Sequence, residues 1–250
     1  MLGLGTLLNV AAVVLGGTVG TLLGDRLPAR VRDVVTDGLG LVTLMVGGLN
    51  AAAVLDPALA DEVSRGVPIL IVLASVVIGG VIGASLRLEA RLEGLGAILQ
   101  RRLAGGQGSP ERRRRFIEGY VTASLVFCVG PLTVLGSLQD GIGDGIELLA
   151  LKSVLDGFAA LAFAASLGWG VVASALTVLV FQGTLTLLGA VVGEVMTDGQ
   201  VAALTATGGV LLLGVGLRLL SIKQLPVGDL LPALLAAPLL TALLGTFLDS

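Results

Sequence analysis

The chain has 250 residues, of which 55% are hydrophobic and only 13% are charged, whereas an ordinary soluble domain carries about 25% charged residues. So much apolar surface cannot be buried inside one soluble domain, which excludes that class of protein. The formal net charge is −3. The absence of His removes the commonest zinc ligand and general base, and the single Cys128 excludes a disulfide framework, so no metal or other cofactor is expected.

Eight apolar runs are long enough to cross a bilayer as helices, at about 20 residues for each crossing. They consist mainly of Leu, Val, Ala and Gly, which favours closely packed helices in lipid, whereas the strands of a membrane barrel would alternate over about ten residues. The sequence therefore predicts an all-α, polytopic integral membrane helical bundle that forms one transmembrane domain over residues 1–250. In chain order, the predicted helices cover 5–24, 38–55, 67–86, 116–138, 146–167, 170–192, 201–217 and 228–248.

The first predicted helix carries no preceding Lys or Arg, so it is interpreted as a retained helix rather than a cleaved signal. It resembles the sixth helix, and the second resembles the seventh, so matching helices would point in opposite directions. This pattern suggests an inverted repeat of helices one to three and six to eight around the central pair four and five. The shared feature is a pair of small residues four positions apart, for which close helix packing alone is the alternative explanation. These pairs are Gly16 with Gly20, Gly79 with Gly83 and Gly189 with Gly193.

Nearly all of the 15 basic residues lie in the connections that follow helices one, three and seven. If eight helices cross the membrane, these connections share one side, and the positive-inside rule places them in the cytoplasm with both termini outside. The run Arg112–Arg115 lacks interleaved aromatic residues and directly precedes a membrane helix, so anionic lipid headgroups explain it better than nucleic acid. The other basic residues of these connections are Arg26, Arg30, Arg32, Arg87, Arg91, Arg101, Arg102, Arg218 and Lys223.

The longest connection, 87–115, begins with leucines at helical spacing opposite charged positions. This pattern predicts a cytoplasmic amphipathic helix at the membrane interface. A linker rich in Gly, Gln and Ser follows it, and Ser109-Pro110 predicts the start of the fourth membrane helix. The leucines are Leu88, Leu92, Leu95, Leu99 and Leu103.

The fourth and fifth predicted helices hold the residues least compatible with lipid. Lys152 and Asp156 lie four positions apart and hence on one helix face, at a depth where an unpaired charge costs at least about 3 kcal/mol. The stretch 153–157 also repeats the Ser-x-x-Asp-Gly pattern of 137–141. These residues predict a pathway for an ion or small solute, with a purely structural ion pair as the alternative. The candidate residues are Lys152, Asp156, Gln139, Asp140, Ser153 and, in the sixth helix, Gln182.

Gly130 and Pro131 lie in the middle of the fourth predicted helix. Proline lacks an amide hydrogen, so the pair predicts a kink or a break that frees backbone carbonyls to line a cavity. Many membrane helices nevertheless contain proline without any site. Asn9 and Asn50, in the first two helices, would either add polar lining or form ordinary hydrogen bonds between helices.

The stretch 141–144 reads Gly-Ile-Gly-Asp and matches the signature of intramembrane aspartyl peptidases, in which two carboxylates share a proton. Asp140 or Asp156 would be the second acid. Four residues in a glycine-rich chain are a weak match, and the predicted topology places Asp144 in an external loop. No zinc-peptidase, phosphate-loop or His-dependent triad motif is present, so no enzyme is expected.

Three stretches, 5–28, 136–171 and 212–238, resemble the YqgA/YdfK-like family of bacterial membrane proteins, domain of unknown function 554. The most specific is the central one, which contains the repeated Asp-Gly and the Lys-Ser pair. The resemblance covers nearly the whole chain and implies a multi-pass protein of the bacterial cytoplasmic (inner) membrane. It implies no activity and no catalytic residues.

The sequence thus favours a small secondary transporter or permease for an ion or small solute, in which Lys152 holds the Asp156 carboxylate ionised until a solute or a conformational change displaces it. The alternative is a non-transporting membrane scaffold or partner subunit, and an intramembrane aspartyl peptidase is the third hypothesis. Expected partners are the lipid bilayer, an unidentified ion or small solute and, in a homo-oligomer, further copies of the chain. Nucleic acid is not expected as a partner.

Overall fold

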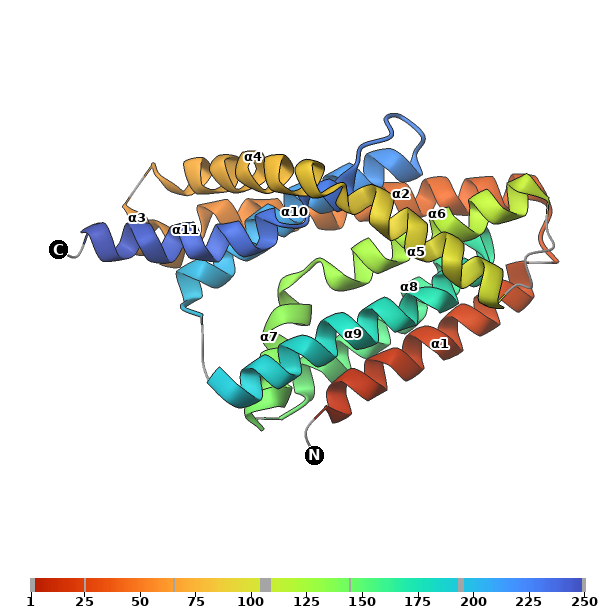
Figure 1. Ribbon diagram of the computed structural model, residues 1–250, viewed down its shortest axis with the longest axis horizontal. Helices are drawn as coiled ribbons and strands as arrows, with labels where there is room; N and C mark the ends of the chain where they lie inside the picture. Colours follow the sequence, from red (N-terminus) through yellow and green to blue (C-terminus); the bar gives the residue numbers. More distant parts are fainter. Residues whose placement is uncertain are drawn as a thin grey trace. The chain divides into compact units, whose positions relative to one another are not determined.

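The computed structural model describes residues 3–24, 26–64, 66–103, 109–143, 145–192 and 196–248. Within these ranges every regular element is a helix (Figure 1), which confirms the predicted all-α class. The helices are α1 (Leu4–Gly24), α2 (Ala29–Ala51), the 3₁₀ helix η1 (Ala52–Leu55), α3 (Pro57–Val63), α4 (Pro68–Leu86), α5 (Leu88–Leu103), α6 (Pro110–Cys128), α7 (Pro131–Ile142), α8 (Glu147–Leu167), α9 (Trp169–Val192), α10 (Asp198–Leu219), the 3₁₀ helix η2 (Val227–Leu230) and α11 (Ala233–Leu248).

Seven of the described helical segments are long and apolar enough to cross a membrane, and the count is eight if α6 and α7 form one bent crossing. Their outer faces expose large apolar side chains, such as Leu15 at 67%, Val81 at 64% and Val191 at 83%. Contact with water would cost about 25 cal/mol for each Å² of such surface, whereas lipid tails cover it without that cost. The chain is therefore a multi-pass membrane protein, as its composition predicts.

The predicted helix boundaries differ most from the structure in the second, fourth and eighth predicted helices. α2 begins at Ala29 rather than near 38, directly after Pro28, a residue that is common at helix starts, so the charged stretch 29–37 is helical. The helix predicted over 116–138 consists of two helices, α6 and α7, which are bent by 62° at a break, as the Gly130-Pro131 pair predicts. Gly130 between them has a φ of 154°, which favours glycine. The predicted helix 228–248 is instead η2 followed by α11, with Pro232 between them.

The helices pack into two compact units, which are described separately. Unit 1 comprises residues 1–39, 90–128 and 132–195 and contains α1, α6, α8, α9 and nearly all of α5 and α7. Unit 2 comprises residues 40–89, 129–131 and 196–250 and contains α3, α4, α10, α11 and the second half of α2.

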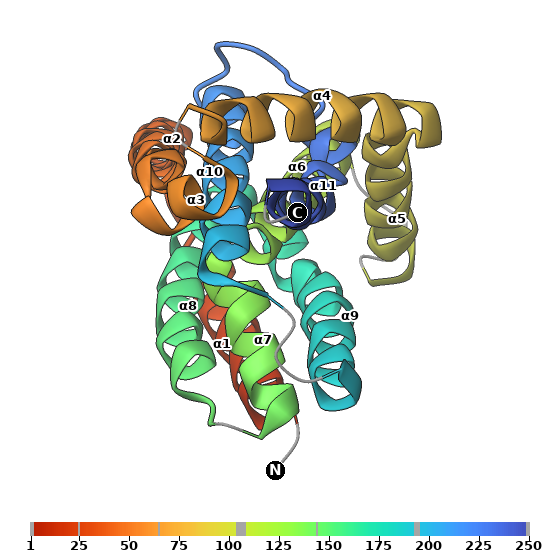
Figure 2. The ribbon, with the colours of Figure 1, turned by 90° about the vertical axis from the view of Figure 1, so that its left-hand side faces the viewer.

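In unit 1, α1 packs along α8 through a stripe of glycines (Figure 2). A side chain at any of these positions would overlap the backbone of α8, so only glycine permits the close approach. In order, Gly16, Gly20 and Gly24 lie against the carbonyls of Gly157, Leu161 and Ala165. Because both sets of numbers rise together, the two helices are parallel.

The direction of these helices bears on the number of crossings. α9 runs opposite to α1, since Gly17 lies against Val172 and Thr6 contacts Thr186. If α2 and α4 each cross the membrane once, α8 is parallel to α1 only when α6 and α7 together make a third crossing between them. The packing thus favours eight crossings over seven.

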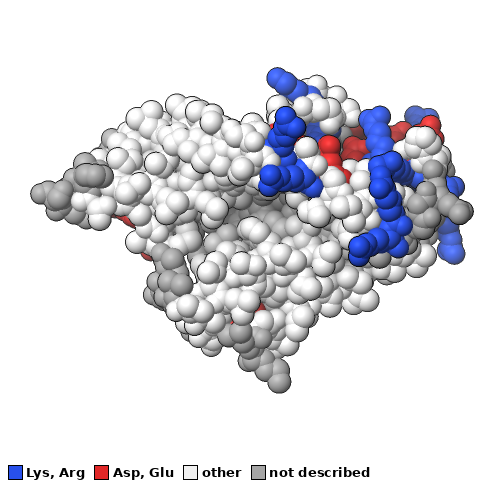
Figure 3. Space-filling view, viewed as in Figure 1, with Lys and Arg blue, Asp and Glu red and all other residues white. Residues whose placement is uncertain are grey.

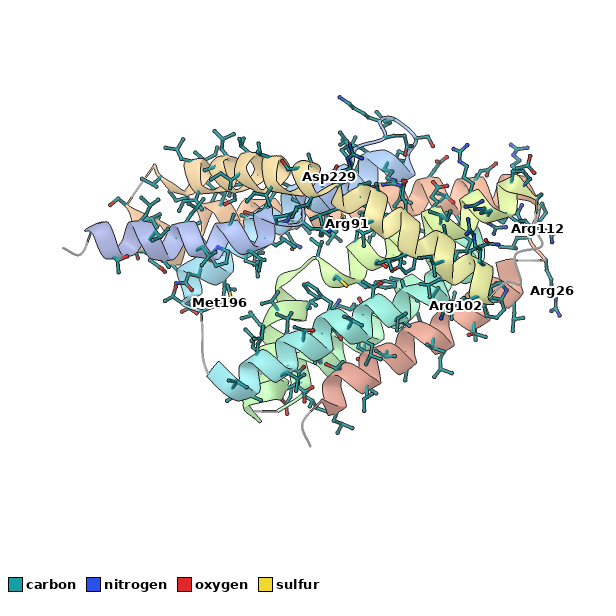
Figure 4. The ribbon with its side chains drawn as sticks, in the orientation of Figure 1. Arg26, Arg91, Arg102, Arg112, Met196 and Asp229 are labelled. Carbon is teal, nitrogen blue, oxygen red and sulfur yellow. The ribbon has the colours of Figure 1, made fainter. Side chains whose placement is uncertain are left out.

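Many basic side chains of unit 1 lie toward one end (Figure 3), where α1 ends, α6 begins and α8 ends, whereas Arg91 (Figure 4) and the buried Lys152 lie elsewhere. Figure 4 labels Arg26, Arg102 and Arg112 at this end. Here the Nε of Arg115 donates to the carbonyl of Ser166 at 2.7 Å, and the Ser166 hydroxyl donates to the carbonyl of Arg32 at 3.2 Å. We call this the arginine end of unit 1.

The amphipathic segment predicted within 87–115 is α5. Its Gly96 lies against the ring of Tyr120 on α6, so this part of α5 packs on unit 1. Leu95 and Ile98 are about half exposed, at 49% and 51%. An apolar stripe of this kind suits a helix that lies at a membrane surface.

Unit 2 has a small apolar core formed by α3, α4, α10 and α11. It contains Leu59, Val63, Ile71, Ala203 and Ala237. Small residues again permit close packing, and the glycines involved are Gly47 of α2 against Leu213, Gly79 of α4 against Ala233, and Gly209 of α10 against Ala51.

An ion pair lies where α4, α5, α10 and η2 of unit 2 meet. The Glu89 carboxylate pairs with Arg218 and accepts a hydrogen bond from the amide of Gly228 at 2.6 Å. The Glu89 amide donates in turn to Asp229 Oδ1 at 2.9 Å. These contacts fix the start of α5 to the end of α10 and to η2.

Candidate functional site

Buried polar side chains gather between α1, α7, α8 and α9 of unit 1. Consecutive turns of α1 connect them, because Thr6 contacts α7 and α9 while Asn9 contacts α8. We call this set the polar cluster. Its members are Thr6, Asn9, Ser137, Asp140, Lys152, Asp156, Gln182 and Thr186.

Lys152 and Asp156 form an ion pair in the middle of α8. The Lys152 Nζ lies 2.9 Å from Asp156 Oδ1 and 2.8 Å from Oδ2. At 1.5 Å per residue, Asp156 lies about 14 Å from the start of α8, which is close to the centre of a crossing helix. The two side chains are only 7% and 9% exposed, so the pair lies deep within unit 1.

Asn9 of α1 is the second partner of this carboxylate. Its Nδ2 donates to Asp156 Oδ2 at 3.0 Å. The glycine stripe of α1 sets this contact, because it brings the two helix backbones close enough for short side chains to meet. Lys152 and Asn9 together donate hydrogen bonds to both oxygens of the Asp156 carboxylate. Such charge-assisted bonds are stronger than bonds between neutral groups.

The end of α6 lies near this pair. Cys128, the last residue of α6, is buried, and Lys152 and Asp156 lie close enough to its thiol to interact with it electrostatically. Phe127 of α6 also packs edge-to-face on Phe163 of α8, with ring centroids 6.3 Å apart. α6 therefore ends beside a buried charge pair.

Asp140 of α7 lies at the other side of the polar cluster. Its Oδ2 accepts a hydrogen bond from the backbone amide of Thr6 at 3.3 Å. The hydroxyls of Thr6 and Thr186 share a hydrogen bond, with 3.1 Å between the oxygens. Gly141 lies directly against the carbonyl of Thr186, so α7 and α9 are in backbone contact here.

The repeated Ser-x-x-Asp-Gly pattern is used in a similar way at both places. In each copy the aspartate is buried and accepts from α1, Asp140 from Thr6 and Asp156 from Asn9. In each copy the glycine lies against a neighbouring helix, Gly141 against α9 and Gly157 against α1. The two copies of the pattern thus each place a carboxylate in contact with α1.

The remaining predicted residues are placed differently. The Ser153 hydroxyl donates to Leu149 O of its own helix at 2.6 Å, so it is not part of the polar cluster. Gln139 is half-buried and lies about 100° around α7 from Asp140. Gln182 is fully buried, one turn from Thr186 on α9. Gly130 lies in the break that α7 follows, and Asn50 is half-buried at the end of α2 in unit 2.

Thr6 and Thr186 are members of the cluster that the sequence analysis missed. Threonines are common in membrane helices, where most bond to their own backbone, as Thr18 does to the carbonyl of Val14 at 2.6 Å. The available signal was their spacing: Thr6 lies one turn before Asn9, and Thr186 one turn after Gln182. Asp144 of the peptidase pattern lies outside the described residues.

The chain is similar to a known protein family and to individual members of it. The model of a family described as "Protein of unknown function (DUF554)" matches residues 4–242. The chain is 33% identical over 239 residues to the "Uncharacterized protein YqgA" of Escherichia coli (strain K12), covering 96% of each chain. It is 27% identical over 243 residues to the "Uncharacterized membrane protein YdfK" of Bacillus subtilis (strain 168), covering 97% of each. No solved structure matches it significantly.

Proposed function

We propose that this protein, which belongs to the DUF554 family of proteins of unknown function, is a small secondary transporter or permease for an ion or small solute. The observation that carries the proposal is the Lys152–Asp156 pair with Asn9, buried at the middle of a membrane-crossing helix. The polar cluster around it is the proposed solute pathway. The protein is not proposed to be an enzyme.

The energetics support a functional role for this pair. A charge at the centre of a membrane helix costs at least about 3 kcal/mol, and replacing a buried ion pair by apolar residues is often neutral or stabilising. A chain that needed only packing at this place would therefore gain nothing from Lys152 and Asp156. A solute that takes over one of their bonds would gain a strong, charge-assisted contact in return.

The surrounding helices support movement. α6 and α7 are separated by a break, and α6 ends near the ion pair. Secondary transporters commonly place such discontinuous helices at mid-membrane sites. The predicted inverted repeat would supply the two halves that rock around the site, and it stays a prediction.

The second candidate function is a non-transporting scaffold or partner subunit. The observation that favours it is the completeness of the contacts of Asp156, since Lys152 and Asn9 both donate to it. In a scaffold the pair would only fix how α1 and α8 meet. Homo-oligomerisation would suit either role.

The test is electrical. Purified protein in vesicles on a solid-supported membrane is exposed to concentration jumps of Na⁺, K⁺, H⁺ and a panel of amino acids, organic acids and nucleosides. We expect a solute-evoked current with the wild type and its loss with Asp156→Asn. The matched control is Ser153→Ala, a neighbour on α8 whose hydroxyl bonds only to its own helix. A wild type without a current for any compound, or an Asp156→Asn variant with the full current, contradicts the proposal and favours the scaffold.

The proposed location is the bacterial cytoplasmic membrane, with both termini on the outer face. The arginine end of unit 1 supports it, because positive residues favour the cytoplasmic side and α1 ends there. Reporter fusions at each terminus test this: activity of a periplasm-dependent reporter at both ends is expected, and activity at one end alone contradicts an even number of crossings.

A further inference from the structure

Asp140 is a buried carboxylate that has no compensating cation among the described residues. It is only 1% exposed, and among the described residues no Lys or Arg forms an ion pair with it. Its Oδ2 accepts from the amide of Thr6, but its Oδ1 has no hydrogen-bond partner within the described part of the chain. Since Lys152 and Asp156 neutralise each other, the polar cluster carries one uncompensated negative charge. Removing a carboxylate from water without a partner is unfavourable.

Neutral oxygen donors lie on the helix turns that adjoin this charge. Thr6, whose amide bonds to Asp140, shares a hydrogen bond between hydroxyls with Thr186, and each hydroxyl keeps a lone pair free of that bond. Ser137 lies one turn before Asp140 on α7, and Gln182 one turn before Thr186 on α9. Both are fully buried, and the Ser137 hydroxyl and both polar atoms of the Gln182 amide have no partner among the described residues.

We infer that the Asp140 end of the polar cluster binds a monovalent alkali-metal cation, such as Na⁺. Carboxylate, hydroxyl and amide oxygens are the ligands that hard cations prefer. One carboxylate matches one positive charge, whereas a divalent ion would leave a net positive charge buried. Among the described residues no three His, Cys, Asp or Glu side chains form the acid-rich group that typically holds a divalent metal.

The position of this site suggests what the cation does, and this step rests on the proposed permease function. Asp140 lies near the end of α7 and Thr6 near the start of α1, so the site lies close to the membrane surface opposite the arginine end. Thr6 and Asn9 share one face of α1. A cation that draws Thr6 and Asp140 together would therefore shift Asn9, which holds Asp156. The cation would serve as the coupling ion.

The experiment measures cation-dependent thermal stability of the purified protein in detergent, in NaCl, KCl or choline chloride at equal ionic strength and without any solute. A cation that binds only the folded state raises its melting temperature. We expect a saturable rise in Na⁺ or K⁺ over choline for the wild type and for Ser153→Ala. The rise should vanish in Asp140→Asn.

A second variant guards against misfolding of Asp140→Asn. Gln182→Met keeps the side-chain volume but removes the amide, so it should shift the half-saturating cation concentration upward by tenfold or more. The inference is overturned if Na⁺ and K⁺ act like choline on the wild type, or if both variants keep the wild-type response. If cations raise the melting temperature but no solute evokes a current, the permease proposal is rejected and the cation site is supported. If a solute evokes a current but cations do not raise the melting temperature, only the cation site is rejected.

Discussion

Asn9 on α1 donates to the Oδ2 of Asp156 on α8 at 3.0 Å, on a carboxylate that Lys152 already holds from its own helix. This bond ties the first membrane helix to the only ion pair described in unit 1. It also makes α1 responsive to any change in the charge of that pair.

Replacing Asn9 by Ala should lower the free energy of unfolding by about 1.5–3 kcal/mol, the usual range for a hydrogen bond to a charged group. An SDS titration of the purified protein measures this loss. Thr18→Ala is the control on the same helix, since the Thr18 hydroxyl is exposed and bonds only to the carbonyl of Val14. Equal stability of the two variants would show that the bond between Asn9 and Asp156 contributes little.

Lys152→Met should destabilise the protein by about 3–5 kcal/mol, because it leaves the Asp156 carboxylate buried with Asn9 alone. The double variant Lys152→Met with Asp156→Asn removes both charges and should regain most of that loss. The same titration measures all members of the cycle. A permease predicts that the stable double variant lacks the solute-evoked current, whereas a full current in it would assign the pair a structural role.

Gly20→Ala should separate α1 from α8, because a Cβ at this position overlaps the carbonyl of Leu161. Overpacking of this kind costs about 1–3 kcal/mol. Gly48→Ala is the matched control, since no atom lies within 4 Å of its Cβ position, and it should be neutral or slightly stabilising because alanine favours helix. Cross-linking of cysteines placed on α1 and α8 gives a second readout. Unchanged stability and cross-linking in Gly20→Ala would refute the proposed register.

Glu89→Ala should destabilise unit 2, because it leaves Arg218 and the amide of Gly228 without their carboxylate. The pair is largely buried, with side chains 11% and 13% exposed, so a loss of about 3 kcal/mol is expected. Limited proteolysis should show faster cleavage between α10 and α11. Glu93→Ala, an exposed acid on the same helix, should change neither quantity.

The helices could be predicted from the sequence because each needs only a long apolar run, and the depth of Lys152 and Asp156 follows from their place in such a run. Their partner could not, because the contact with Asn9 joins residues 147 positions apart and depends on which helices meet. The hydroxyls of Thr6 and Thr186 could not be told from those of Thr18 or Thr184, which bond to their own helices. Gly130 and Pro131 predicted the break between α6 and α7.

The glycine stripe of α1 packs against α8, which is synthesised much later than α1. This order has a consequence for biogenesis. A ribosome that adds about 5–20 residues per second needs about 7–30 seconds to synthesise the 147 residues that separate Asn9 from Asp156. During this interval α1 resides in the bilayer before α8 can bond to Asn9 and pack on the glycine stripe. Nascent chains arrested before α8 should therefore be targets for membrane quality-control proteases, and full-length chains should escape them.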